Sequence, residues 1–147
     1  MFESILVATD GSEHADKALD IACDLAQKYG SRLTILSVYR HHSMPGSTHS
    51  MVGGTVELEP PDVTLGKLAR EITDTALARA REKGVPQVEG LVRRGPPART
   101  IVQVAKERGA DAIAMGSRGL GDAEGFFLGS VSHKVSSLAE CTCITVK

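Results

Sequence analysis

The stretch DAIAMGSRGLGDAEGFFLGSV, residues 111–131, joins a short apolar run to a helical pattern through a segment rich in glycine. The run at 111–115 has the length and composition of a buried strand, and the helical pattern covers 130–139. Five of the seventeen residues from 115 to 131 are glycine. Glycine loses more conformational entropy on folding than other residues, so a folded domain needs a reason to place it here. We infer that another group approaches this backbone closely.

The same order of strand, loop and helix recurs along the whole chain. Apolar runs predict strands at 3–9, 32–39, 87–93, 111–115 and 143–146. Apolar residues at helical spacing predict helices at 13–29, 64–83, 96–108 and 130–139. This alternation predicts an α/β fold, with a five-stranded parallel sheet and helices on both faces. Two strand orders fit, 3-2-1-4-5 and 2-1-3-4-5. In the first order, the loops after the first and fourth strands face the same crevice.

Composition limits the classes of partner. The chain has 147 residues, which predicts a single domain over 1–147. Seventeen Lys and Arg against 18 Asp and Glu give a net charge of −1, so we expect no nucleic-acid partner. No apolar run has the length of a membrane span, and the first residues lack the pattern of a signal peptide. Three cysteines, an odd number, fit a reducing compartment. We therefore expect a cytoplasmic protein without membrane insertion, with Cys141 and Cys143 as buried side chains rather than metal ligands.

The segment 40–62 is long for a connection and rich in Gly, Pro, Ser and Thr. Such segments are functional or mobile, so we predict a long flexible loop here. It holds His41, His42 and His49. No group that would orient them as metal ligands can be identified, so we predict solvated histidines and no metal site.

Three known phosphate-binding patterns fail on the glycine-rich stretch. Gly116 and Gly121 have the glycine separation of a P-loop, but Asp122 occupies the lysine position and would repel phosphate. The dinucleotide fingerprint needs three glycines after the first strand, where the sequence TDGSEHADK has one. A phospho-acceptor receiver domain needs an aspartate at the end of the third strand, where VRRG offers arginines.

The spacing that remains is Gly116-x2-Gly119-x9-Gly129-Ser130. It resembles the nucleotide motif of the universal stress protein family, in its ATP-binding subgroup. ILVATDGS near the start, RTIVQVAKERGADAIAMGSRG before the loop and CITVK at the end also resemble that family. The segment after the second strand, beginning HHS, is similar to the transporter-associated branch. The resemblance implies the strand order 3-2-1-4-5 of the adenine nucleotide alpha hydrolase-like fold. Thr142 departs from the family, in which many members carry proline.

The glycines and the helix start suit a phosphate chain. Gly116 and Gly119 expose backbone N–H groups to an anion, and Gly129 and Ser130 begin a helix, where free N–H groups and the dipole favour phosphate. The resemblance places Asp10 at the ribose or adenine, although its position in TDGS also fits a turn or helix cap. Arg118 is expected in solvent rather than on a phosphate. The resemblance also places Val38 against the adenine and Ala8 and Thr9 in the turn of Asp10. With the motif residues, the nucleotide site that it implies is Ala8, Thr9, Asp10, Val38, Met115, Gly116, Ser117, Arg118, Gly119, Gly129, Ser130, Val131 and Ser132.

The function predicted from these features is regulation rather than catalysis. The motif has no cradle lysine, no evident base for water and no carboxylate pair for Mg²⁺, so we expect at most weak ATPase activity and no catalytic residues. The expected ligand is ATP, with Mg²⁺ carried by its phosphates. A slow ATPase or another nucleotide-processing enzyme is the alternative function, and AMP, ADP and cyclic AMP are alternative ligands. By resemblance we also expect a homodimer through the last strand, which could assemble further into a tetramer. A protein partner, such as a transporter, is expected at the loop 40–62.

Overall fold

The computed structural model describes residues 1–41, 61–119 and 129–147. In chain order the elements are β1 (Ser4–Ala8), α1 (Glu13–Tyr29), β2 (Arg32–Tyr39), α2 (Pro61–Glu82), β3 (Val88–Arg94), α3 (Pro97–Glu107), β4 (Ala112–Gly116), α4 (Ser130–Leu138) and β5 (Thr142–Val146). None of the helices in these ranges has both the length and the apolar character that crossing a membrane requires.

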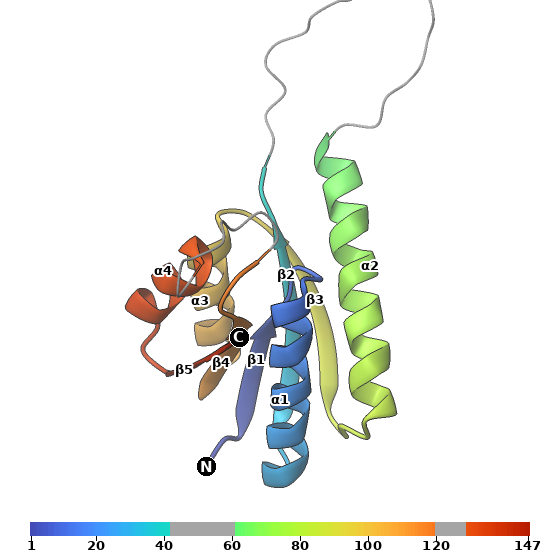
Figure 1. Cartoon of the computed structure of the whole chain (residues 1–147), viewed down its shortest axis with the longest axis vertical. Coiled ribbons are helices and arrows are strands. Elements are labelled where there is room, and N and C mark those ends of the chain that lie inside the picture. Colours follow the sequence, from blue (N-terminus) through green and yellow to red (C-terminus); the bar gives the residue numbers. More distant parts are fainter. Residues whose placement is uncertain (42–60, 120–128) are drawn as a thin grey trace, which may run out of the picture.

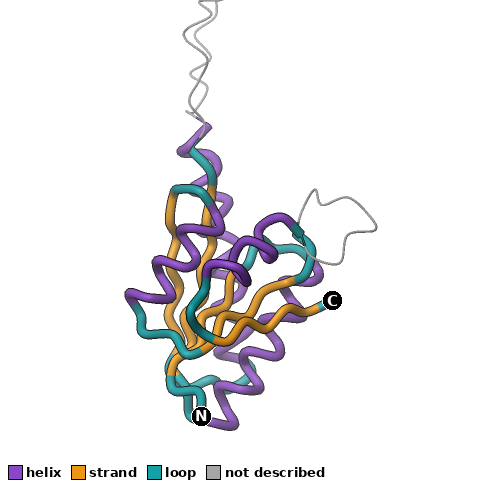
Figure 2. Tube along the Cα trace, turned by 90° about the vertical axis from the view of Figure 1, so that its left-hand side faces the viewer, coloured by secondary structure: helices purple, strands orange, loops and turns teal. Residues whose placement is uncertain are grey.

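The strands form one parallel sheet in the order β3-β2-β1-β4-β5, which confirms the predicted fold class (Figure 1). Because β1 pairs with both β2 and β4, the order 2-1-3-4-5 is excluded. From β1 the chain adds β2 and β3 on one side and then β4 and β5 on the other, so the strand order switches between β1 and β4. Ligands of such sheets bind beyond the carboxyl ends of the strands at this point. In Figure 2 the strands run alongside one another, and the N-terminus lies at the end of the sheet opposite to the loops that follow the strands.

Helices cover both faces of the sheet, as predicted (Figure 1). Successive strand side chains point to opposite faces, so neighbours such as Ile5 and Leu6 enter different cores. The core under α1 and α2 contains Ile5, Val7, Ala18, Leu19, Ala22, Leu33, Ile35, Ala76, Ala80 and Ala114. The core under α3 and α4 contains Leu6, Leu36, Ile101, Val104, Ile113, Met115 and Val135. The strand residues are apolar on both faces because both faces are covered.

The ends of α1 lie where the sequence predicts them. Ser12 is the N-cap, and its Oγ accepts a hydrogen bond from the Ala15 N–H at 3.3 Å. Gly30 ends the helix in the left-handed region at φ 67°. This conformation would cost a residue with a Cβ about 1–2 kcal/mol. These two residues fix the length of the helix that begins beside the predicted site.

Helix α2 begins earlier than predicted, at Pro61 instead of residue 64. Proline suits a first turn because it lacks an N–H, and an N–H at this position would have no partner within the helix. Asp62 adds an acidic side chain that favours a helix start. The predicted loop 40–62 therefore ends before residue 61, where α2 begins. Residues 42–60 of it, with His42 and His49, lie outside the described residues.

Asp111 fastens the beginning of β1 to the beginning of β4. Its Oδ2 accepts hydrogen bonds from the backbone N–H of Glu3 at 2.7 Å and of Ser4 at 3.0 Å. Its own backbone N–H donates to the Ser4 carbonyl at 2.8 Å. The two N–H donors favour the charged carboxylate, so they hold the pKa of Asp111 below its ordinary value of 3.8.

We predict that Asp111→Ala lowers the free energy of unfolding at pH 7 and has a smaller effect in acid. A depressed pKa contributes stability above the unfolded-state value of about 3.9, and this contribution is lost as the pH falls through the folded-state value. The gap between the unfolding curves of the two proteins should therefore close as the pH falls below 4 or so. Urea titrations at several pH values measure it, and a gap that does not depend on pH would contradict the assignment.

Strand β5 is an edge of the sheet, and the hydrogen bonds to β4 show which of its residues point outward. The Thr142 N–H donates to the Asp111 carbonyl at 3.2 Å, and the Ser117 N–H donates to the Val146 carbonyl at 2.7 Å. Residues of a strand alternate between its two neighbours, so Thr142 and Val146 face β4, whereas Cys143 and Thr145 turn their backbone groups to the open side.

We predict a homodimer paired along this open side, because an uncovered edge presents a row of N–H and C=O groups to a second chain. Thr145→Pro removes an outward donor and should shift the protein toward monomer, while Thr145→Ala keeps the N–H and should not. Light scattering on both variants measures the mass. A monomer in the unmutated protein would show that β5 does not pair.

Candidate functional site

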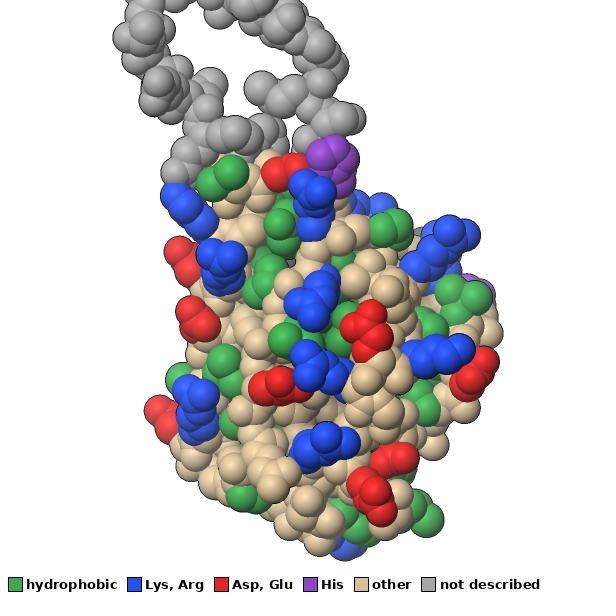
Figure 3. All heavy atoms as spheres, turned by 180° about the vertical axis from the view of Figure 1, so that it is seen from behind, with side chains coloured by type: hydrophobic (Ala, Val, Ile, Leu, Met, Phe, Trp, Pro, Cys, Tyr) green, Lys and Arg blue, Asp and Glu red, His purple; other side chains and the backbone are tan. Residues whose placement is uncertain are grey.

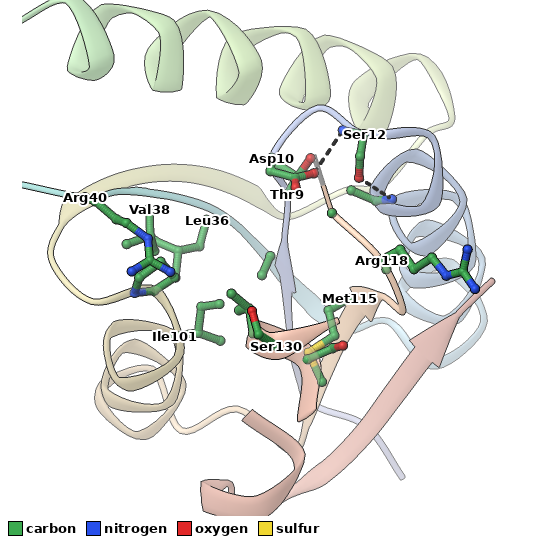
Figure 4. Close-up of a pocket in the computed structure, with 17 residues that line it drawn as sticks. Thr9, Asp10, Ser12, Leu36, Val38, Arg40, Ile101, Met115, Arg118 and Ser130 are labelled. Atoms are coloured by element: carbon green, nitrogen blue, oxygen red, sulfur yellow. Dashed lines mark hydrogen bonds between the residues drawn. The ribbon is translucent and has the colours of Figure 1, made fainter. Parts of the chain in front are cut away.

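The loops that follow β1 and β4 enclose a cavity of about 330 Å³ at the point where the strand order reverses (Figure 4). Its volume falls within the range of small-molecule pockets, roughly 300 to 1,000 Å³. The predicted site residues that line it are Ala8, Thr9, Asp10, Val38, Met115, Gly116, Arg118, Gly119, Ser130, Val131 and Ser132. Ser117 and Gly129 do not line it. The sequence therefore brings together residues from both ends of the chain.

The loop after β1 is held by its own side chains. Asp10 Oδ1 accepts a hydrogen bond from the Ser12 N–H at 2.9 Å, and Thr9 Oγ1 accepts one from the Gly11 N–H at 3.2 Å. Gly11 has φ 79°, in the left-handed region that favours glycine. Asp10 thus makes the turn that the sequence offered as its alternative role, and its side chain also lines the cavity. The turn is confirmed, and the same carboxylate borders the cavity in which the nucleotide contact is predicted.

Gly116, the last residue of β4, lies against the first turn of α1. A Cβ on Gly116 would lie 2.8 Å from the backbone N of Ala15 and 2.8 Å from the carbonyl carbon of His14. Real Cβ atoms do not approach backbone atoms so closely, so a side chain here would push β4 and α1 apart. The inference that some group approaches this glycine is correct, and in the described structure that group is the chain's own helix.

Ser117 is buried behind the wall of the cavity and joins three elements. Its N–H donates to Val146 of β5 at 2.7 Å, and its Oγ lies 3.1 Å from His14 Nδ1 of α1. Its carbonyl accepts hydrogen bonds from the Gly129 N–H and, at 3.1 Å, from the Ser132 hydroxyl at the start of α4. The backbone groups of Ser117 and the N–H of Gly129 therefore bond within the protein and position the start of α4 beside the cavity.

One side of the cavity is apolar and comes mostly from residues outside the motif. Leu36 and Val38 enter from β2, and Ile101 enters from α3 (Figure 4). The residues that sequence reasoning missed are Ser12, Ala15, Leu36, Arg40, Pro97 and Ile101. Arg40 could have been found, because it follows directly after the strand that carries Val38.

Two arginines lie at opposite sides of the cavity. The Arg118 guanidinium points away from the other labelled residues, whereas Arg40 lies next to Val38 (Figure 4). Asp10 is the one acidic residue among the described residues that line the cavity. The cavity therefore combines two arginines, the hydroxyl groups of serines and the start of α4. Such a set of groups suits an anion.

The candidate metal ligands do not assemble in the described ranges, where no three His, Cys, Asp or Glu side chains are placed to hold an ion. His41 Nδ1 lies 2.6 Å from an Asp62 carboxylate oxygen instead. Burial raises the pKa of the Cys23 thiol to about 11, and burial also raises the pKa of Cys141 and of Cys143. The last two pack against the core under α3 and α4, but they are half-buried rather than buried as predicted, because β5 is an edge strand.

Comparisons with known proteins agree over the whole chain. A family model described as the universal stress protein family matches residues 1–147. Universal stress protein YxiE of Bacillus subtilis is 39% identical over 154 residues, covering 100% of both chains. A universal stress protein solved with cAMP has a TM-score of 0.75 at 24% identity, covering 99% of this chain and 97% of that chain. A universal stress protein of Archaeoglobus fulgidus solved with dAMP has a TM-score of 0.70 at 26% identity, covering 99% and 98%.

We predict that Gly116→Ala destabilises the protein by about 1–3 kcal/mol, the usual cost of overpacking a closely packed site. Rotation of a side chain cannot relieve a contact with the backbone of Ala15. Gly66→Ala is the matched control, because its Cβ would meet the movable hydroxyl of Tyr39 at 3.3 Å, and alanine favours the helix. Thermal unfolding compares the two. Equal stability of Gly116→Ala and the unmutated protein would disprove the close approach.

Proposed function

Because this chain belongs to the universal stress protein family, we propose that its cavity binds an adenine nucleotide, with ATP as the ligand, and that the protein is a nucleotide-dependent regulator of a stress response. The observation that carries the proposal is the meeting of the β1 and β4 loops on one cavity with an apolar side and an anion-binding side. Adenosine and phosphate need these two environments in the same ligand.

The lining residues suggest how the nucleotide lies. The adenine ring packs against Val38 and Ile101, which supply apolar surface. The carboxylate of Asp10 accepts hydrogen bonds from the ribose hydroxyl groups. The phosphates lie over Gly119 and at the start of α4, where the hydroxyl of Ser130 and unpaired backbone N–H groups can donate. Mg²⁺, when bound, supplies positive charge to the phosphates, and the described carboxylates do not form a cluster that would hold it alone.

Two kinds of support come from relatives and from the lining. The Archaeoglobus fulgidus relative was solved with dAMP, an adenine nucleotide. The described lining of the cavity contains no lysine and no histidine and has one carboxylate, Asp10. Fast phosphoryl transfer uses a cation on the transferred phosphate, metal ligands and a group that positions water. The described lining has arginines as cations, but with one carboxylate and no histidine it offers no pair of metal ligands and no evident base for water. The lining thus favours binding over turnover and supports a regulatory role. The segment 42–60 would carry that role to a partner.

Ser130→Asp tests the proposal without endangering the fold. An acidic residue in the first turn favours the helix by about 0.3–1 kcal/mol, yet it places a negative charge where the phosphates would lie. We expect ATP affinity to fall at least tenfold, which corresponds to about 1.4 kcal/mol. Ser136→Asp, on the same helix but away from the cavity, introduces the same charge and should retain affinity. Isothermal titration calorimetry measures both.

The same titrations, repeated with AMP, ADP and cyclic AMP as the alternative ligands, identify the nucleotide that binds most tightly. Tighter binding of one of them would change the assigned ligand but not the site. Unaltered ATP affinity in folded Ser130→Asp would refute the site. ATP hydrolysis at the ordinary enzymatic scale of ~1 to 10³ per second would favour the alternative of an enzyme over a regulator.

A further inference from the structure

A second hollow of about 470 Å³ lies between the first turn of α3 and the length of α4 and adjoins the cavity. We call it the α3–α4 groove. Arg40, Pro97, Ser130 and Val131 line both spaces, so the groove continues the cavity at the start of α4. A ligand that leaves the cavity past Ser130 enters the groove.

The permanently charged side chains among the described residues that line the groove are all positive. Arg40, Arg99 and Lys134 contribute three permanent positive charges, and the described residues that line the groove include no Asp or Glu. Neither α3 nor α4 has an acidic residue in its first turn. Three positive charges without a carboxylate among them repel one another, so an anion between them would be stabilised.

This arrangement differs from other parts of the described surface, where cations lie beside carboxylates. In Figure 3, Lys and Arg side chains are interspersed with Asp and Glu over one face of the molecule. Arg108 lies 3.2 Å from Glu89, and Arg79 lies 2.6 Å from Asp20. Within the described ranges, the arginines and the lysine of the groove have no such carboxylate partner. The groove thus holds unneutralised positive charge next to the site where phosphate is proposed.

The spacing along α4 matches a phosphate chain. Ser130 and Lys134 are four residues apart on one helix, so they lie on the same face, separated by about 6 Å along the axis. Both helices also begin without a side-chain cap, at Pro96 and Gly129. A phosphate at Ser130 is therefore about one helical turn from the Lys134 ammonium, with the Arg99 guanidinium on the facing helix.

We propose that the α3–α4 groove binds the phosphates of an adenosine polyphosphate that lie farthest from the ribose. The inference rests on the proposed function and narrows it: the preferred ligand has a long phosphate chain, and AMP lacks the part that the groove recognises. An acidic peptide is the other polyanion that such charges could hold. The residues shared with the cavity favour the nucleotide, since one ligand can then occupy both spaces.

The test measures how affinity changes with the length of the phosphate chain. AMP, ATP and adenosine 5′-tetraphosphate are titrated into the unmutated protein and into the double variant Arg99→Gln, Lys134→Gln. We expect affinity to rise along the series in the unmutated protein, and the gain from AMP to the tetraphosphate to fall at least tenfold in the double variant. AMP affinity should be equal in both. Lys106→Gln, on α3 but outside the groove, is the matched control and should keep the full gain.

The outcomes separate the groove from the nucleotide site. A gain that is the same in the double variant, or no gain in the unmutated protein while AMP binds, overturns the groove and leaves the proposed function standing. If no adenine nucleotide binds, the proposed function fails. Inorganic tripolyphosphate then decides the groove: binding that is lost in the double variant supports a polyphosphate site, and no binding overturns it. Competition by a poly-glutamate peptide with no effect of phosphate length would overturn it in favour of a peptide.

Discussion

The close approach of β4 to the first turn of α1 is the constraint on which the site depends. Without a side chain, Gly116 lets the end of β4 lie against the backbone of His14 and Ala15. The loops that follow β1 and β4 are thereby brought to one cavity. Ser117 then directs the chain, since its backbone and hydroxyl groups bond to β5, α1 and the start of α4. One glycine and one serine therefore position the helix whose N-terminus faces the cavity.

Much of the fold could be predicted because local rules and the tertiary structure agree. Ser12 and Gly30 bound α1 as capping rules require. The strands read as continuous apolar runs because helices cover both faces of the sheet. The strand order could not be derived in this way. The alternation of strands and helices allows two orders, and the pairing of β1 with β4 depends on contacts between distant residues that no local pattern reports.

The candidate site could be predicted where a residue's role is set by its place at a strand end. The family resemblance supplied Asp10 and Val38, which lie at or just after strand ends, and both line the cavity. Motif membership was less informative for Ser117 and Gly129, because glycine spacing alone does not distinguish an N–H that faces a ligand from one that bonds within the protein. The Gly129 N–H donates to the Ser117 carbonyl. Ile101 of the cavity and Arg99 of the groove could not be predicted for another reason. The packing of α3 against the sheet, which no local pattern reports, brings them to these places.

The charges around the site give a bound nucleotide a direction. Asp10 is the single carboxylate of the described lining and stands in the loop after β1, whereas Ser130 begins α4 and lines both the cavity and the α3–α4 groove. A phosphate chain placed against Asp10 would meet a like charge, which costs free energy in a partly desolvated pocket. The same chain placed at the start of α4 meets backbone N–H groups, hydroxyl groups and cations. The ribose, which carries neutral donors, is the part of the ligand that a carboxylate accepts without repulsion. The position of one acidic residue and of one helix start thus selects the orientation before any contact specific to adenine is made.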